Sequence, residues 1–240
     1  MRIKKGKYIG FCFGVKRAIS IAEDILKKED VKAATFGPII HNPQVVKALS
    51  ARGLSVINDI KDARNRCVII RSHGIAPKLK KVFQKKSVRL IDATCPFVKR
   101  IQDIINFVKK QGYFILIAGE QKHPEVLALS DIAGKNSKVI GSAKELKGLK
   151  ALKGKVALVA QSTLSYEDFY SIISELPKYR WPEIRIYDTI CKDVAKRQQE
   201  AIDIAEKCSL VIVVGGKKSA NTKRLAKLCK DCLLYTSPSP

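Results

Sequence analysis

The stretch Val88-Arg-Leu-Ile-Asp-Ala-Thr-Cys-Pro-Phe-Val-Lys-Arg100 shows the pattern that decides the fold. Its first residues, Val88–Ile91, are mostly aliphatic and predict a strand, whereas Phe97–Lys110 has apolar residues at three- and four-residue steps and predicts a helix. Cys95 lies just before this helix. Because strand-like and helix-like segments alternate along the chain, we predict an α/β protein with parallel sheets and right-handed crossovers.

The same alternation predicts the remaining elements and the domains. The further predicted strands are Tyr8–Cys12, Ala33–Phe36, Val68–Arg71, Tyr113–Ala118, Val156–Ala160 and Leu210–Val214. The further predicted helices are Val15–Lys28, Pro43–Ser50, Pro77–Lys86, Tyr166–Leu176, Val194–Lys207 and Ser219–Cys229. This order predicts α/β domains over 1–94 and 95–190 and a partial third domain over 191–232. We expect the proline-rich residues 233–240 to be disordered or foreign to the gene.

Cys95 has two counterparts in a similar local frame. Cys12 begins Cys-Phe-Gly-Val-Lys-Arg and Cys191 begins Cys-Lys-Asp-Val-Ala-Lys-Arg, each before a helix-like segment. The dipole and the N–H groups of a helix N-terminus should lower the pKa of such a cysteine. Three thiolates at equivalent places predict three lobes that meet at one thiophilic group. We interpret that group as an iron–sulfur cluster rather than a structural zinc, because three sulfurs leave a metal position open. Three buried, unreactive cysteines are the alternative.

The other four cysteines lack this frame. Cys67 and Cys208 flank predicted strands and are expected in the core. Cys229 and Cys232 have Cys-x-x-Cys spacing, but no second pair accompanies them, so we do not favour a zinc or redox site there.

All three histidines fall in loops that follow predicted strands. His41, His73 and His123 each lie beside a glycine or proline turn, and imidazole can donate hydrogen bonds to phosphate oxygens. Metal ligation by all three is an alternative that their spacing does not support. Glu125 lies on a turn that opens a short helix. Near a desolvated charge its pKa would be raised, and it could donate a proton; an ordinary first-turn glutamate is the alternative.

Two further loops carry polar side chains at the ends of predicted strands. Ser162 and Thr163 lie in Gln161-Ser-Thr-Leu-Ser165, where hydroxyls can cap the next helix or bind a ligand oxygen. The loop Gly215-Gly-Lys-Lys-Ser-Ala-Asn221 has two glycines that let its backbone approach a ligand. Ser219 and Asn221 lie near the following helix start, where anions bind well. The spacing excludes a P-loop.

The chain is strongly basic, with 46 Lys and Arg against 22 Asp and Glu and a net charge of +24. A nucleic-acid-binding protein is one interpretation of this charge. We favour a basic globular surface that suits an anionic substrate, because the basic residues are spread along the chain and aromatic residues make up only 7 %.

Composition also bounds the class of protein. Hydrophobic residues make up 46 % of the chain, which is enough for a folded core. No apolar run reaches the ~18 residues that a membrane span needs, and the first residues do not form a secretory signal. Seven cysteines without framework spacing argue against a disulfide scaffold. We therefore expect a cytoplasmic protein without membrane contact.

Eight of these features occur in a fixed order along the chain. They are Gly10-Phe-Cys-Phe-Gly-Val-Lys-Arg-Ala18, Ile40-His-Asn42, Ser72-His-Gly74, Asp92-Ala-Thr-Cys-Pro96, His123-Pro-Glu-Val126, Gln161-Ser-Thr-Leu-Ser165, Cys191 and Gly215-Gly-Lys-Lys-Ser-Ala-Asn221. In this order the chain, from residue 1 to about 230, resembles the 4-hydroxy-3-methylbut-2-enyl diphosphate reductases, which are the IspH/LytB family.

The resemblance implies three α/β domains around a central [4Fe–4S] cluster that leaves one iron open. Each domain would supply one cysteine ligand: Cys12, Cys95 and Cys191. In this family the open iron acts as a Lewis acid toward the allylic hydroxyl of the substrate. Two electrons, from a donor such as ferredoxin or flavodoxin, and protons remove that hydroxyl as water. The implied products are isopentenyl diphosphate and dimethylallyl diphosphate, from the last step of the non-mevalonate isoprenoid route.

The resemblance also implies roles for individual side chains. His41, His73 and His123 match the histidines of the diphosphate pocket, and Glu125 matches the proton donor.

Two substitutions depart from the family pattern. Ser162, beside Thr163 in the substrate site, stands where a threonine is usual and keeps the hydroxyl that would hold the reacting group. Ser219 and Asn221 match diphosphate contacts, whereas Ala220 stands where many members have a second serine. The family pattern continues with a serine-bearing loop beyond this chain, so we expect an incomplete third domain. The alternatives to an active reductase are a basic α/β nucleic-acid-binding protein and a cluster-carrying protein that has lost turnover.

Overall fold

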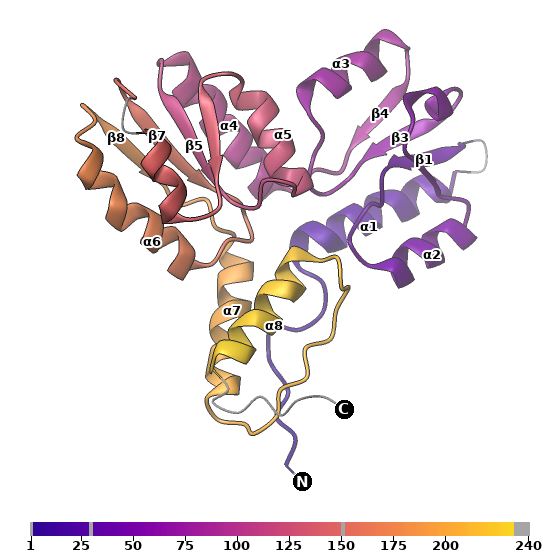
Figure 1. Ribbon diagram of the computed structural model, residues 1–240. Coiled ribbons are helices and arrows are strands. Elements are labelled where there is room, and N and C mark those ends of the chain that lie inside the picture. Colours follow the sequence, from indigo (N-terminus) through magenta and orange to yellow (C-terminus); the bar gives the residue numbers. More distant parts are fainter. Residues whose placement is uncertain (1, 29–30, 150–151, 233–240) are drawn as a thin grey trace.

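The computed structural model describes residues 2–28, 31–149 and 152–232, and these form three lobes around a common centre (Figure 1). Two lobes each contain a four-stranded parallel sheet, which confirms the predicted α/β class. The third lobe is built from helices and irregular segments. The tail at 233–240, predicted to be disordered or foreign, lies outside the described residues.

The first sheet has the strand order β2-β1-β3-β4, and all its pairs are parallel. Helices α1 and α2 pack on one face through residues such as Ala22 and Leu49, and α3 packs on the other through Phe83. The elements of this lobe are α1 (Phe13–Leu26), β1 (Ala33–Phe36), α2 (Pro43–Ala51), β2 (Ser55–Ile57), a 3-10 turn (Ile60–Ala63), β3 (Cys67–Ile70), α3 (Pro77–Lys85) and β4 (Arg89–Asp92).

The second sheet repeats this topology with the order β6-β5-β7-β8. Helices α4 and α5 cover one face through residues such as Ile105 and Leu129, and α6 covers the other through Phe169. The elements are α4 (Pro96–Lys110), β5 (Phe114–Ala118), α5 (Pro124–Ala133), β6 (Ser137–Ile140), a 3-10 turn (Ala143–Leu149), β7 (Val156–Ala160), α6 (Tyr166–Glu175), a 3-10 turn (Leu176–Tyr179) and β8 (Ile184–Tyr187).

The third lobe contains α7 (Lys192–Ala205), α8 (Ala220–Cys232) and the N-terminal segment that leads into α1 (Figure 1). The predicted strands at Tyr8–Cys12 and Leu210–Val214 are wrong, because neither segment joins a sheet in the part of the chain that the structure describes. In the first segment, the Tyr8 N–H donates to Glu200 of α7 and the Gly10 carbonyl accepts from Arg197 of the same helix. In the second, Leu210 and Val214 are exposed, so its aliphatic pattern has no buried face to stabilise a strand. The expected incompleteness of the third domain stays a prediction.

The other predicted strands and all predicted helices form, with small shifts at their ends. Sequence reasoning missed β2, β6 and β8, which all lie at sheet edges. An edge strand is buried less completely than a central one and lacks a continuous aliphatic run, so its local signal is weak. Within the described ranges, no helix is both long and apolar enough to cross a membrane. The domain boundaries after residues 94 and 190 stay a prediction.

Candidate active site

The three cysteines in the repeated frame each occupy the N-cap position of a helix. Cys12 precedes α1, Cys95 precedes α4 and Cys191 precedes α7. The first turn of α1 passes directly against Cys95, because a Cβ added at Gly14 would lie 2.5 Å from the Cys95 Sγ. A negative charge on Cys12 or on Cys191 raises the pKa of Cys95, which shows that both sulfurs lie near that of Cys95.

The pKa of two of these thiols departs from the expectation. Burial raises the pKa of Cys95 and Cys191, although N–H groups from the first turn of each following helix act in the opposite direction. The prediction of a lowered pKa is therefore wrong for this pair, because desolvation outweighs the helix N-terminus. A bound cation would be needed to hold both as thiolates at neutral pH.

The spacing of the cysteines indicates which metal group they fit. Among the described residues, the three cysteine sulfurs do not all lie within 4.8 Å of one another. A single zinc ion with Zn–S bonds of about 2.3 Å needs sulfurs at most about 4.6 Å apart. The arrangement therefore does not suit one shared ion, whereas a multi-iron cluster bridges a wider space with thiolate ligands.

The turns that lead into Cys95 and Cys191 have the same hydrogen bonds. Asp92 accepts from the N–H of Thr94 at 2.9 Å, and in the second sheet Asp188 accepts from the N–H of Ile190 at 3.1 Å. The Cys95 N–H then donates to the Ser72 carbonyl, and the Cys191 N–H donates to the Ser162 carbonyl, both at 2.9 Å. The loops after β4 and β8 thus hold Cys95 and Cys191 through equivalent backbone hydrogen bonds.

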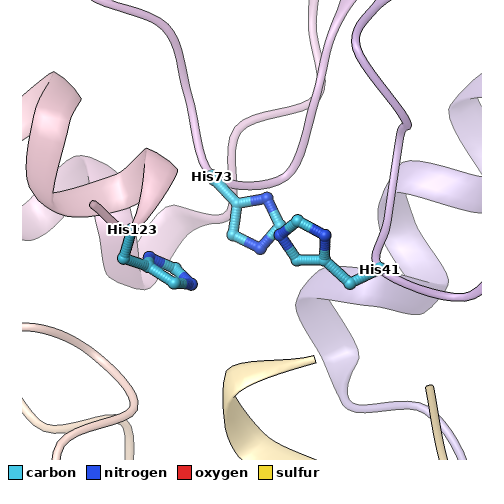
Figure 2. Close-up of side chains that lie close together, drawn as sticks. All are labelled: His41, His73 and His123. Atoms are coloured by element: carbon cyan, nitrogen blue, oxygen red, sulfur yellow. The ribbon is translucent and has the colours of Figure 1, made fainter. Parts of the chain in front are cut away.

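Three histidines from different loops meet in one cluster, as Figure 2 shows. The ring centroids of His41 and His73 are 4.6 Å apart, and the ring of His123 lies 5.5 Å from His73 and 6.1 Å from His41. His41 precedes α2, His73 follows β3, and His123 is the N-cap of α5. One ligand nitrogen from each ring lies within 4.8 Å of the others, so the geometry alone would also allow a metal ion.

The histidine cluster is neutral and lies in basic surroundings. Burial lowers the pKa of all three, well below the usual value for His73 and to about 4 for His123. The positive charges of Arg71 and Lys223 lower the pKa of His41 and His123 further. At neutral pH the rings are therefore uncharged but lie close to cations, an environment that favours an anion over a metal cation.

Several polar atoms around this cluster are oriented for a ligand. Four of the buried polar atoms that have no hydrogen-bond partner among the described residues belong to this region: Arg71 Nε, His41 Nε2, His73 Nδ1 and Asn221 Oδ1. Because unpaired buried polar groups are costly, a bound anion with several acceptor oxygens would satisfy the donors among them.

Sequence reasoning did not single out Arg71 as a functional residue. It follows β3 directly, and the guanidinium packs against Gly37, where a Cβ would lie 2.9 Å from an Arg71 terminal nitrogen. Gly37 also has a positive φ of 70°, so a side chain there would be disfavoured twice. Its position two residues before His73 is the sequence feature that could have identified Arg71 as a functional residue.

The third lobe closes on the histidines through the loop before α8. Gly216 lies against the first lobe so closely that an added Cβ would overlap the carbonyl oxygen of His41. Ser219 accepts a hydrogen bond from the N–H of Thr222 at 3.3 Å and so caps α8. Ala220 is the first residue of this helix and is buried, and Asn221 follows it. The structure thus brings the loop before α8 against the backbone of His41, and contacts from Ser219, Ala220 and Asn221 to a ligand stay a prediction.

An ion pair fixes α8 to the second lobe. The guanidinium of Arg224 lies 2.5 Å from the carboxylate of Asp168 on α6, and the side chain of Arg224 is mostly buried. Arg224 follows Asn221 by three residues, so both lie on one face of the helix. The pair therefore fixes the rotation of α8 about its axis, and with it the direction of the helix face that carries Asn221.

Glu125 and Ser162 form a buried pair. The Glu125 carboxylate accepts from the Ser162 N–H at 2.6 Å and from the Ser162 hydroxyl at 2.7 Å. Burial raises the pKa of Glu125, and the two hydrogen bonds from Ser162 act against this shift. Neighbouring Thr163 uses its hydroxyl differently, as an acceptor for the Gln161 side chain at 2.9 Å. The carboxyl of Glu125, whose pKa is raised, therefore lies beside the hydroxyl of Ser162.

Comparison with known proteins identifies the family of the chain. The family model described as "LytB protein" matches residues 3–237. The chain belongs to the LytB family. A relative from Trichlorobacter lovleyi named 4-hydroxy-3-methylbut-2-enyl diphosphate reductase is 41 % identical over 231 residues, which cover 96 % of this chain and 81 % of the relative. A reductase of the same name from Caldanaerobacter subterraneus subsp. tengcongensis is 41 % identical over 97 % of this chain and 82 % of its own length.

Solved structures of LytB relatives agree with this assignment. A reductase described as the terminal enzyme of the non-mevalonate pathway has a TM-score of 0.76 and 35 % identity, and the match covers 96 % of this chain and 82 % of that one. The Plasmodium falciparum reductase has a TM-score of 0.86 and 32 % identity over 92 % of this chain and 71 % of that one. Both favour the LytB reductase over the nucleic-acid-binding alternative.

Proposed function

We propose that this LytB-family chain reductively removes the allylic hydroxyl of 4-hydroxy-3-methylbut-2-enyl diphosphate and releases isopentenyl and dimethylallyl diphosphate. Each turnover breaks one C–O bond, consumes two electrons and two protons, and releases one water. The observation that carries this proposal is the placement of three N-cap cysteines, a neutral histidine cluster and the Glu125–Ser162 pair around one centre.

The cysteines fit an iron–sulfur cofactor, which membership of the family implies. We assign Cys12, Cys95 and Cys191 as ligands of a [4Fe–4S] cluster, one from each of three domains. Their spacing exceeds that for a single ion, and the bare backbone of Gly14 leaves room for the Cys95 sulfur. When bound, the cluster would supply electrons and a Lewis-acidic iron for the substrate hydroxyl.

The histidine cluster is assigned to the diphosphate. His41, His73 and His123 would donate hydrogen bonds to its oxygens, and Arg71 would add a fixed positive charge. From the third lobe, Ser219 and Asn221 would contact the same group, with the backbone of Ala220 between them at the start of α8. The basic surroundings make a diphosphate a better occupant than a metal ion.

Glu125 is assigned as the proton donor, and Ser162 as the residue that orients both it and the substrate hydroxyl. A carboxyl with a raised pKa keeps its proton to a higher pH than an ordinary glutamate and can release it to a departing oxygen. The Ser162 hydroxyl lies 2.7 Å from Glu125, so it can relay a proton or bind the reacting oxygen. Thr163 would support the same loop through Gln161.

Reductants of low potential such as ferredoxin or flavodoxin are the proposed electron donors, because the reaction consumes electrons and the basic chain would attract an acidic protein. The cytoplasm stays the predicted compartment.

Anaerobic reconstitution with iron and sulfide, followed by an assay with the allylic diphosphate and a chemical reductant, tests the proposal. We expect iron–sulfur absorption and release of both products. A protein that binds no cluster under these conditions would overturn the proposal. Cluster spectra without turnover would instead favour the alternative of a cluster carrier that has lost activity.

A further inference from the structure

The segment Gly6–Gly10, here called the N-terminal strap, leads directly to Cys12 and lies along helix α7. The carboxylate of Glu200 accepts hydrogen bonds from two successive backbone N–H groups of the strap, from Lys7 at 2.5 Å and from Tyr8 at 2.9 Å. Both are charge-assisted bonds, which are roughly twice as strong as neutral ones. A single side chain therefore fixes two adjacent residues of a segment that has no regular secondary structure.

Two more contacts from the same face of α7 hold the strap. The guanidinium of Arg197 donates to the carbonyl oxygen of Gly10 at 2.9 Å, and the ammonium of Lys196 lies 5.9 Å from the centre of the Tyr8 ring. Arg197 and Lys196 lie three and four residues before Glu200, which places all three on one side of the helix. The strap therefore runs toward the N-terminus of α7, where Cys191 is the N-cap.

The Glu200 carboxylate occupies the space beside Gly6 of the strap. A Cβ added at Gly6 would lie 2.8 Å from a carboxylate oxygen of Glu200 and 3.6 Å from the Ile204 Cδ1. A methyl group at Gly6 would therefore push the Glu200 carboxylate away from its place beside the strap.

We propose that Glu200 is a positioning residue that sets the register of the N-terminal strap on α7 and so holds Cys12 at a fixed place beside Cys191. A shift of the strap by one residue along the helix would displace Cys12 by up to about 3.3 Å. Such a displacement is large compared with the length of an iron–sulfur bond. The inference rests on the proposed function only in assigning these two cysteines to the cluster.

Hydrogen exchange of the cluster-free full chain measures the contact itself. In Glu200→Ala we expect the amides of Lys7 and Tyr8 to exchange about tenfold faster than in the unchanged protein, because both lose a charged acceptor. Glu200→Gln should lie between the two, since the amide oxygen keeps one acceptor without the charge. Glu206→Ala is the matched control, because it removes an exposed carboxylate from the end of the same helix.

Thiol labelling and cluster retention measure the consequence. In cluster-free Glu200→Ala and Gly6→Ala, we expect Cys12 to react with iodoacetamide at least about threefold faster than in the Glu206→Ala control, with the Cys191 rate unchanged. In the reconstituted proteins, we expect the iron–sulfur absorption to be lost to a chelator several-fold faster in both variants. Gly6→Ala tests the contact from the strap side while leaving Glu200 in place.

Unchanged exchange of the Lys7 and Tyr8 amides in Glu200→Ala would overturn the inference, as would faster exchange with Cys12 labelling equal to the control. If neither the variants nor the unchanged protein bind a cluster, the proposed function is wrong. The exchange and labelling data on the cluster-free chain still decide whether Glu200 positions Cys12.

Discussion

The carboxylate of Glu125 accepts two hydrogen bonds from Ser162, one from its N–H at 2.6 Å and one from its hydroxyl at 2.7 Å. This pair joins the start of α5 to the loop after β7, so the proposed proton donor and a hydroxyl that could hold the substrate fix one another's position. Both residues are almost fully buried, which keeps solvent from competing for the proton.

Glu125→Gln should leave the cluster intact and lower kcat by about 10²- to 10⁴-fold, because the amide keeps the shape but cannot donate the proton. Since burial raises the pKa of Glu125, turnover of the unchanged enzyme should fall as pH rises through that raised pKa. Steady-state rates across pH and iron–sulfur absorption measure both effects. Glu120→Gln, an exposed neighbour, is the control. Equal turnover in the two variants would remove Glu125 from the proton-donor role.

Binding of inorganic diphosphate should take up protons at pH 7. The pKa of His123 is lowered to about 4, and those of His41 and His73 are also lowered, so the free rings are neutral at that pH. A bound anion raises these pKa values, and affinity should therefore increase as pH falls from about 8 to 6. Calorimetry in two buffers of different ionisation enthalpy counts the protons. The same count in His123→Asn would contradict the prediction, because the protonation of diphosphate itself is common to both proteins.

Arg224→Ala should weaken diphosphate binding by about 3- to 10-fold without changing the iron–sulfur spectrum. The variant breaks the mostly buried pair with Asp168 and frees the face of α8 that carries Asn221. Arg224→Lys should restore part of the affinity. Arg52→Ala, which breaks an exposed pair with Glu23, is the matched control. An affinity for Arg224→Ala equal to that of this control would show that the pair does not position the helix.

Ala220→Ser should bind diphosphate about 3- to 10-fold more tightly. The residue begins α8, where an added hydroxyl can donate to an anion at the helix N-terminus. Titration calorimetry with inorganic diphosphate measures the gain, and Ala201→Ser within α7 serves as a control away from this helix start. Unchanged or weaker binding would mean that this backbone position does not face the ligand.

Gly14→Ala should prevent stable cluster binding while the protein still folds. The new methyl group would lie 2.5 Å from the Cys95 Sγ and force that sulfur away from its place. Iron and sulfide content after reconstitution, with circular dichroism for the fold, checks this. Gly148→Ala is a suitable control because its nearest atom is the flexible end of Lys138. Full cluster content in Gly14→Ala would argue against Cys95 as a ligand at its present position.

Much of the fold could be predicted from local patterns. Central strands such as Val156–Ala160 are buried on both faces, so their sequences are continuous aliphatic runs. Helices such as Pro96–Lys110 show their buried stripe as a period in the sequence. Edge strands such as Ser55–Ile57 were missed, and Leu210–Val214 was wrong, because strand formation depends on a neighbour that the segment itself does not specify.

For the site, the sequence identified the groups but not their relationships. It indicated that Cys12, Cys95 and Cys191 begin helices and that His41, His73 and His123 lie in loops. The raised pKa of Cys95 and Cys191 was not predicted, because burial is a property of the folded surroundings and here outweighs the helix N-terminus. Arg71 was quoted in its motif but not assigned a role.

Residue order alone indicates the alternation of strands and helices, the position of the three cysteines before helices and the resemblance to the family. These depend on interactions between residues close in the chain, whose spacing is written in the sequence. The packing of the lobes, in contrast, brings Glu125 to Ser162, gathers three histidines in one cluster and places Glu200 against the segment before Cys12. These contacts join residues far apart in sequence, so they depend on how the lobes pack, which no local pattern specifies.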